Sequence, residues 1–252
     1  ILLSSAIKKY IDFYGVKSGE NIVLFTNNDT AYETALSLND KGVKVEAIID
    51  IRDENDSDIV KSIKNLNIKI FNNHTIVETE GYKRINKVSI MELSKDGTSV
   101  IGKKIDINCD CLGMSGGWTP AVHLFTQSGG KLKFRDNDNV FIPDIYSSDQ
   151  ICIGACNGDF ELNDIISNIP DQINKFLNLN EENFKNIKIS SSKENNYRNI
   201  WLLPSDKILG KTKPFVDYQN DATAKDIKLA LREGFRSIEH VKRYTTTGMG
   251  TD

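Results

Sequence analysis

The stretch VLFTNNDTAYETAL, residues 23–36, decides the fold. An apolar run, 21–25, precedes a polar turn, 26–29, and a segment, 30–40, in which apolar residues recur at helical spacing. A buried strand, a tight turn and a helix in this order are typical of the first unit of a nucleotide-binding domain. The turn contains no glycine, so the question is whether it still binds a dinucleotide.

The flanking sequence repeats the alternation of helix and strand. Residues 4–14 have helical spacing, Val43–Ile51 is a second apolar run, residues 56–66 are amphipathic, and Ile68–Phe71 is a third short apolar run. Alternating helices and buried strands predict a doubly wound parallel sheet with an α/β, Rossmann-like architecture of the FAD/NAD(P)-binding type.

The pattern then changes to consecutive strands. His74–Thr79, Arg84–Leu93 and Gly102–Asn108 are separated by glycine-containing turns, which predicts an antiparallel β-meander that caps the parallel sheet. Cys109–Met114 returns as an apolar strand, with Cys109 and Cys111 on one face.

The second half is less regular. It contains predicted strands at Val140–Pro143 and Gln150–Gly154 and a helix at Asn163–Ile169. Residues 178–213 are rich in Asn, Ser and Lys, which favours a linker-like excursion. A small helix pair ends the sequence, with a capping box at Thr223-x-x-Asp226.

Composition excludes several classes of function. The 252 residues carry a net charge of −3, with no basic run that favours nucleic acid or a membrane surface. No apolar run approaches the roughly 18 residues of a spanning helix. Four cysteines and three histidines lack metal-ligand spacing, which indicates reduced thiols in a cytoplasmic protein and no metal site.

The turn 26–29 departs from the glycine-rich dinucleotide loop. In that loop the glycines form the turn, admit the pyrophosphate and allow the helix to pack on the strand. Asn28 tolerates positive φ, but its Cβ crowds a pyrophosphate, and Asp29, the expected N-cap, adds negative charge. Asp50, 21 residues beyond Asp29, stands where a ribose-binding acid belongs. Asn28 and Asp50 are therefore candidates for a degenerate site that keeps the fold.

Two other segments are candidates for a cofactor-binding edge. The first follows a buried strand and consists of Ser115, Gly116, Gly117, Trp118, Thr119 and Pro120. The second precedes a helix and consists of Gly154, Ala155, Cys156 and Asn157. Glycines let the backbone approach another molecule, and amides before a helix can bind phosphate or ribose. The alternatives are an ordinary loop with Trp118 in the core, and a tight turn.

No catalytic set stands out in the sequence. His123 lies in a helix-like run and His240 lies in the terminal helix pair, where each is more typical of a structural histidine. No Ser/His/Asp set or paired carboxylates occur at a telling spacing. We therefore predict no catalytic residue.

Three motifs resemble the α subunit of heterotetrameric sarcosine oxidases. They are SGGWTPAVHLFTQSGGKL (115–132), FVDYQNDATAKDIKLALREGFRSIEHVKRYTTTGMGTD (215–252) and YGVKSGENIVLFTNNDTAYETALSL (14–38). The resemblance covers nearly the whole chain and is weakest over 178–213. It identifies the sequence as an internal fragment, in keeping with an N-terminal Ile and a polar C-terminal end.

The resemblance implies a domain plan. Residues 1–115 correspond to a second dinucleotide-binding-like domain, 116–177 to the returning part of a first one, and 178–213 to the polar excursion. Residues 214–252 resemble a small [2Fe-2S]-binding domain, whose Cys-x-Cys pair would stand near Asp217-x-Gln219. The module thus lacks those cysteines and is expected to be a structural connector.

The resemblance also implies a function. In this family the α subunit binds NAD and carries a tetrahydrofolate domain, the β subunit holds FAD and FMN, and γ and δ subunits complete the enzyme. It oxidises sarcosine to glycine, forms hydrogen peroxide and passes the one-carbon unit to tetrahydrofolate. We expect the fragment to be inactive by itself. The alternatives are a non-catalytic scaffold that docks subunits and a related amine or opine dehydrogenase α subunit.

Overall fold

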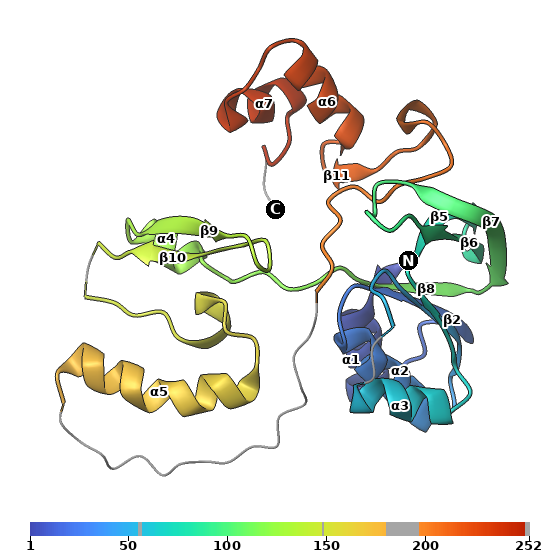
Figure 1. Cartoon of the computed structure of the whole chain (residues 1–252), viewed down its shortest axis with the longest axis horizontal. Coiled ribbons are helices and arrows are strands. Elements are labelled where there is room, and N and C mark those ends of the chain that lie inside the picture. Colours follow the sequence, from blue (N-terminus) through green and yellow to red (C-terminus); the bar gives the residue numbers. More distant parts are fainter. Residues whose placement is uncertain (55–56, 148, 180–196, 250–252) are drawn as a thin grey trace. The chain divides into compact units, whose positions relative to one another are not determined.

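The computed structural model describes residues 1–54, 57–147, 149–179 and 197–249 (Figure 1). They form two compact units, one of Ile1–Asn73 with Cys109–Asn199 and one of His74–Asn108 with Ile200–Asp252. No helix in these ranges has the length and apolar character needed to cross a bilayer.

The first unit is built on a parallel five-stranded sheet. In sheet order its strands are β1 (Leu2–Leu3), β8 (Cys111–Ser115), β2 (Asn21–Thr26), β3 (Lys44–Asp50) and β4 (Lys69–Asn72). The chain runs from β2 outward to β4 and returns on the other side of β2 as β8. This order confirms the predicted parallel α/β sheet of Rossmann-like type, and it places a topological switch between β2 and β8.

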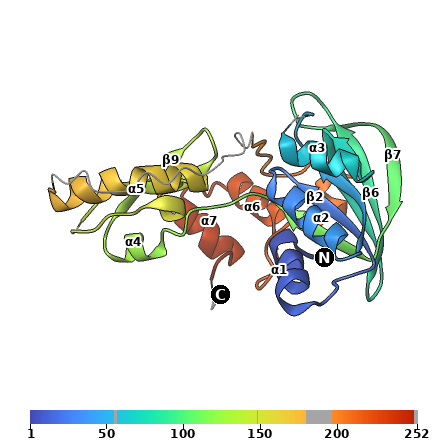
Figure 2. The same ribbon diagram turned by 90° about the horizontal axis from the view of Figure 1, so that it is seen from below.

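Three helices pack against this sheet and against one another (Figure 2). They are α1 (Ser4–Tyr14), α2 (Thr30–Asp40) and α3 (Asp58–Asn65). The core includes Ile7 of α1, Tyr32 of α2 and Ile48 of β3, all fully buried. Gly113 allows the contact between α1 and β8, because a Cβ there would lie 2.9 Å from the side chain of Ile7.

The rest of the first unit includes an antiparallel strand pair and the helices before and after it in sequence. Its elements are α4 (His123–Gln127), β9 (Lys131–Arg135), β10 (Val140–Ile145), the 3-10 helix η1 (Gly154–Asn157) and α5 (Leu162–Leu177). The predicted strand near 140 is confirmed, whereas β9 was not predicted.

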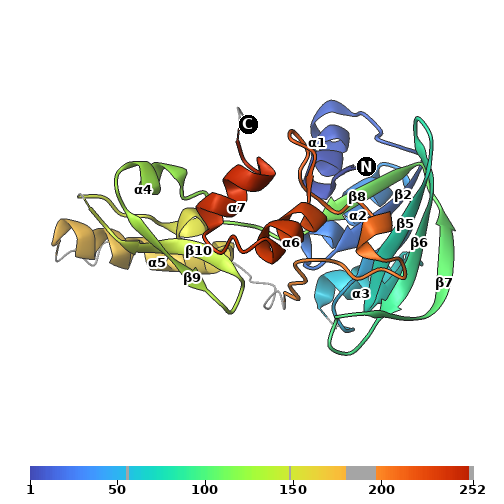
Figure 3. The same ribbon diagram turned by 90° about the horizontal axis from the view of Figure 1, so that it is seen from above.

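The second unit contains the predicted β-meander. Strands β5 (His74–Gly81), β6 (Ile85–Leu93) and β7 (Val100–Asn108) pair antiparallel in this order (Figure 3). The remaining elements are η2 (Leu209–Lys211), β11 (Phe215–Asp217), β12 (Ala222–Thr223), α6 (Ala224–Arg232) and α7 (Ile238–Thr245). The capping box is confirmed, because both Thr223 groups donate to the Asp226 carboxylate, its N–H at 2.8 Å and its hydroxyl at 2.7 Å.

Two local expectations were wrong, and one predicted helix is longer than expected. Residues 150–154 form no strand, since 151–153 are irregular and Gly154 begins η1. Cys109 lies between β7 and β8, so it does not share a strand with Cys111, although both are buried. The helix expected at 163–169 extends over Leu162–Leu177.

The predicted polar excursion, 178–213, is only partly within the described residues, because 180–196 lie outside them. Its later part makes defined contacts. Arg198 donates to the carbonyl of Ile51 at 2.7 Å, and the Asn199 amide donates to the carbonyl of Asp138 at 3.1 Å.

Candidate functional site

The carboxyl ends of β2 and β8 meet at the switch point. These strands are parallel neighbours, and Thr26 stands opposite Ser115. In open α/β sheets a ligand binds in the crevice beyond such strand ends. The structure therefore brings together two sequence-predicted segments, the turn 26–29 and the loop 115–120.

The turn after β2 is filled by its own side chains. Asn28 is fully buried, and its Oδ1 accepts the N–H of Thr30 at 3.0 Å. The N–H of Asn28 donates to Thr26 Oγ1 at 3.1 Å. Asn28 does not use the positive φ that an asparagine tolerates. The N–H groups of Asn28 and Thr30, at the N-terminal end of α2 where a phosphate would be bound, thus have partners within the turn, and the turn does not fit a pyrophosphate.

Side chains of the turn also hold the loop after β8. The amide of Asn28 donates to Ser115 Oγ at 3.2 Å, and the hydroxyl of Thr30 lies 3.0 Å from the same oxygen. The amide of Asn27 donates to the carbonyl of Gly116 at 3.2 Å. Polar groups of the chain itself therefore close the part of the crevice next to the turn.

A buried ion network lies behind this turn. Asp50 is fully buried, and its carboxylate accepts hydrogen bonds from Arg52 Nε at 3.0 Å and from Tyr32 Oη at 2.9 Å. Arg52 Nη2 also donates to Asp29 Oδ1 at 2.7 Å. Asp50 thus serves as a structural counter-ion at the position expected for a ribose ligand. Asp29 stands at the N-cap of α2, but its side chain makes no capping bond.

The electrostatics fix the protonation states of this network. Burial, followed by the charge of Asp50, raises the pKa of Tyr32, so its hydroxyl stays a neutral donor. Burial lowers the pKa of Arg52, but the hydrogen bonds and charges of Asp50 and Asp29 outweigh it and raise that pKa above its ordinary value. Sequence reasoning missed Arg52, although two acids at neighbouring strand ends require a cation.

The loop 115–120 is open on its outer side. Gly116 is exposed, and a Cβ there would meet no atom within 4 Å. Trp118 is 51% exposed, so the alternative of a tryptophan in the core is wrong. The loop borders a hollow of about 520 Å³ that is also lined by residues of α1 and α2, including Phe13 and Thr30. A ligand could approach this backbone from that side.

The segment Gly154–Asn157 forms η1. Gly154 has φ +74° and packs on Ile165, which lies 3.4 Å from the position of a Cβ. The amide of Asn157 donates to the Asp159 carboxylate at 3.2 Å. These contacts explain the segment as a tight turn, one of the two interpretations of the sequence. Across the described part of the chain, no hydrogen bond joins it to the loop 115–120.

Asp217, the last residue of β11, stands where the family resemblance would place a cluster cysteine. Its carboxylate accepts the N–H groups of Gln219 and Gly248, both at 2.8 Å, and thereby fastens the C-terminal turn to β11. Within the ranges that the structure covers, no three His, Cys, Asp or Glu side chains gather as a metal would require.

Comparison with a solved structure supports the fold assignment. L-proline dehydrogenase from P. horikoshii shares the fold with a TM-score of 0.53 at 14% identity, over 96% of this chain and 43% of that chain. This likeness concerns the fold alone. Together with the parallel sheet and its switch point, it confirms a Rossmann-like α/β fold.

Comparison with curated sequences tests the resemblance to the α subunit of sarcosine oxidase. The α subunits of sarcosine oxidase from Corynebacterium sp. (strain P-1) and Rhizobium meliloti (strain 1021) are each 30% identical over the whole chain. The chain spans 26% and 24% of their lengths, about a quarter. Residues 211–252 match the sarcosine oxidase A3 domain. The chain is thus similar along its entire length to part of this subunit, which confirms the resemblance seen in the motifs.

Proposed function

We propose that this chain is a structural segment of the α subunit of a heterotetrameric sarcosine oxidase. The observation that carries the proposal is the alignment of all its residues with the Corynebacterium subunit at 30% identity. The chain would support oxidative demethylation of sarcosine to glycine, with hydrogen peroxide formed and the one-carbon unit passed to tetrahydrofolate. Its partners would be the β, γ and δ subunits in the cytoplasm, with FAD and FMN on the β subunit.

The segment itself would be non-catalytic. The turn after β2 holds Asn28 where a dinucleotide would place its pyrophosphate, and Asp50 is neutralised by Arg52. NAD, the dinucleotide expected in the parent subunit, would be held mainly by residues outside this chain. This chain would contribute only an edge, formed by the loop Ser115–Pro120, which is exposed at 116–119, and by Gly154–Asn157.

A chimaera tests the proposal directly. The matched segment of the Corynebacterium α subunit is replaced by this chain, and sarcosine-dependent peroxide formation is measured after assembly with its partner subunits. We expect an assembled, active enzyme, and no peroxide from this chain by itself. An assembled chimaera without activity would contradict the supporting role, as would peroxide formation by the isolated chain.

A subunit-docking scaffold is the second candidate. It is favoured by aromatic residues on the surface of α1, where Phe13 is 81% exposed and Tyr14 is 61% exposed. Exposed apolar groups of this kind mark interaction surfaces. Replacing Phe13 by Ser in the chimaera separates the candidates, because docking predicts impaired assembly, whereas a purely internal role predicts unchanged assembly. The amine or opine dehydrogenase alternative has only fold likeness in its favour.

A further inference from the structure

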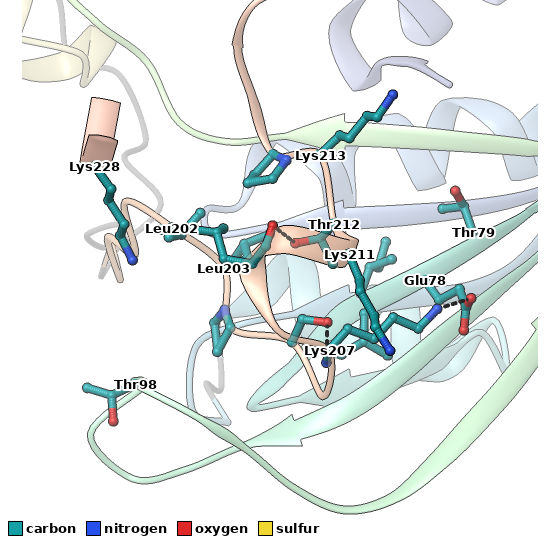
Figure 4. Close-up of a pocket in the computed structure, with 16 residues that line it drawn as sticks. Glu78, Thr79, Thr98, Leu202, Leu203, Lys207, Lys211, Thr212, Lys213 and Lys228 are labelled. Atoms are coloured by element: carbon teal, nitrogen blue, oxygen red, sulfur yellow. Dashed lines mark hydrogen bonds and ion pairs between the residues drawn. The ribbon is translucent and has the colours of Figure 1, made fainter. Parts of the chain in front are cut away.

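A second hollow, of about 600 Å³, lies within the second unit (Figure 4). It is formed by β5, by the turn between β6 and β7, by the segment 202–214 and by the side chain of Lys228 on α6. A volume of several hundred Å³ is that of a site for a small organic molecule. It has no part in the site at the switch point, whose residues all belong to the first unit.

The lining combines an apolar surface with hydroxyl groups. Apolar side chains come from the beginning of β5 and from the segment after Trp201, and include Ile76, Leu202 and Leu203. Thr98 and Thr212 add hydroxyls from two different segments. Such a lining can bind the body of an organic molecule and orient its polar groups.

The charge of the lining is strongly one-sided. It contains four lysines and a single acid, Glu78, which gives 4 − 1 = +3, whereas the whole chain carries −3. Glu78 is already paired, because its carboxylate accepts Lys207 Nζ and Lys104 Nζ, the latter at 3.0 Å. The hydrogen bonds from these two lysines hold the pKa of Glu78 below its ordinary value, so it stays a paired anion.

The other three lysines are not neutralised by an acid of the lining. Lys211, Lys213 and Lys228 are exposed, and among the residues that the structure describes none of them forms an ion pair. Lys207 and Lys211 extend along one side of the hollow, Lys228 comes from α6 on another side, and Lys213 points away from them (Figure 4). Positive groups around a concave surface focus the potential and concentrate anions there.

We propose that this hollow binds a small organic anion that carries two or more phosphate or carboxylate groups. Lysine ammonium groups recognise such anions as point charges, without the planar match that arginine provides. Cations on two sides of one hollow favour a ligand with separated anionic groups. The apolar lining favours a ligand with an organic body between them.

Calorimetric titration of the chain with inorganic pyrophosphate and with citrate tests this proposal. We expect saturable binding with a Kd below about 1 mM that weakens as salt is raised, because the lysines are exposed to solvent. The stronger of the two probes distinguishes phosphate from carboxylate as the preferred group. Absence of saturable binding of both probes at low salt would overturn the proposal.

A pair of variants locates the site. Lys211→Gln combined with Lys228→Gln should weaken binding by about tenfold, since exposed charge pairs are individually modest. Lys225→Gln is the matched control, because it removes one exposed lysine of the same helix that does not line the hollow. Circular dichroism verifies that each variant is folded. Equal affinity of the double variant and the parent would contradict the assignment.

Discussion

Asp50 shows at the scale of one residue how a nucleotide-type sheet can use a strand-end acid for its own structure. In a dinucleotide site such an acid faces the ribose. Here it is fully buried and accepts Arg52 and Tyr32. A buried carboxylate with a guanidinium partner and a phenol donor has little capacity left to bind a ligand. Asp50 therefore stabilises the turn 26–29 through Arg52, instead of binding a ribose beside it.

Removal of the guanidinium tests this assignment. Arg52→Met leaves two carboxylates, Asp50 and Asp29, without their shared cation. We expect the free energy of unfolding to fall by about 3–5 kcal/mol, as for other buried pairs that lose one partner. Tyr32→Phe, the control, removes one hydrogen bond and should cost only about 1–2 kcal/mol. Urea denaturation measures both, and a loss below about 1 kcal/mol for Arg52→Met would refute the buried network.

Cys109 provides a pH-dependent test. Burial, followed by the charges of Cys111 and Asp110, raises the pKa of its thiol from 9.0 to about 11. The unfolded chain therefore loses this proton first, and the stability that the buried neutral thiol contributes is intact below pH 9 and declines as pH rises towards 11. We expect urea denaturation of Cys109→Ala to show a shallower loss of stability across this range than the parent. Identical slopes would mean that the thiol is not buried in its neutral form.

At the scale of elements, the start of α6 depends on one short motif. Thr223 and Asp226 form the capping box that the sequence predicted. Thr223→Ala should destabilise the chain by about 1 kcal/mol, because the backbone N–H of Asp226 loses the side-chain oxygen that accepts its hydrogen bond. Ser237→Ala at α7 is the matched control, since its side chain makes no capping bond. Thermal denaturation compares them, and equal shifts in Tm would argue against the box.

The regular elements were predictable because their signals are local. Strands buried on both faces appear as continuous apolar runs, as in β2 and β3, and glycine turns mark the meander. The run 150–154 has a similar composition but pairs with no strand in the described structure, and a strand needs a partner for its backbone groups. Local patterns cannot supply that information.

The candidate site was only half predictable. The sequence predicted that the turn 26–29 and the loop after Met114 each follow a buried strand, but only the pairing of β2 with β8 shows that they meet at one sheet edge. The sequence could not show that Asn28 turns inward to Thr30 and Ser115, or that Arg52 reaches both Asp50 and Asp29. These contacts join side chains from separate segments, and they exist only after the sheet has formed.

At the scale of the whole molecule, the chain is similar to about a quarter of a sarcosine oxidase α subunit. Its contribution to such an enzyme would be architectural, with a parallel sheet whose switch point is closed by polar side chains. Binding of a dinucleotide at the turn after β2 would be incompatible with that role, because the N–H groups of Asn28 and Thr30 already have hydrogen-bond partners within the turn.

The most direct test of this account is calorimetric titration of NAD into the purified chain, with FAD as the comparison ligand. Our account predicts no saturable heat of binding for either dinucleotide up to about 1 mM. The denaturation curve of the same sample establishes that the chain is folded. Tight NAD binding by the folded chain would mean that the turn from Thr26 to Asp29 works without glycine, and it would contradict the proposal that this site has been lost.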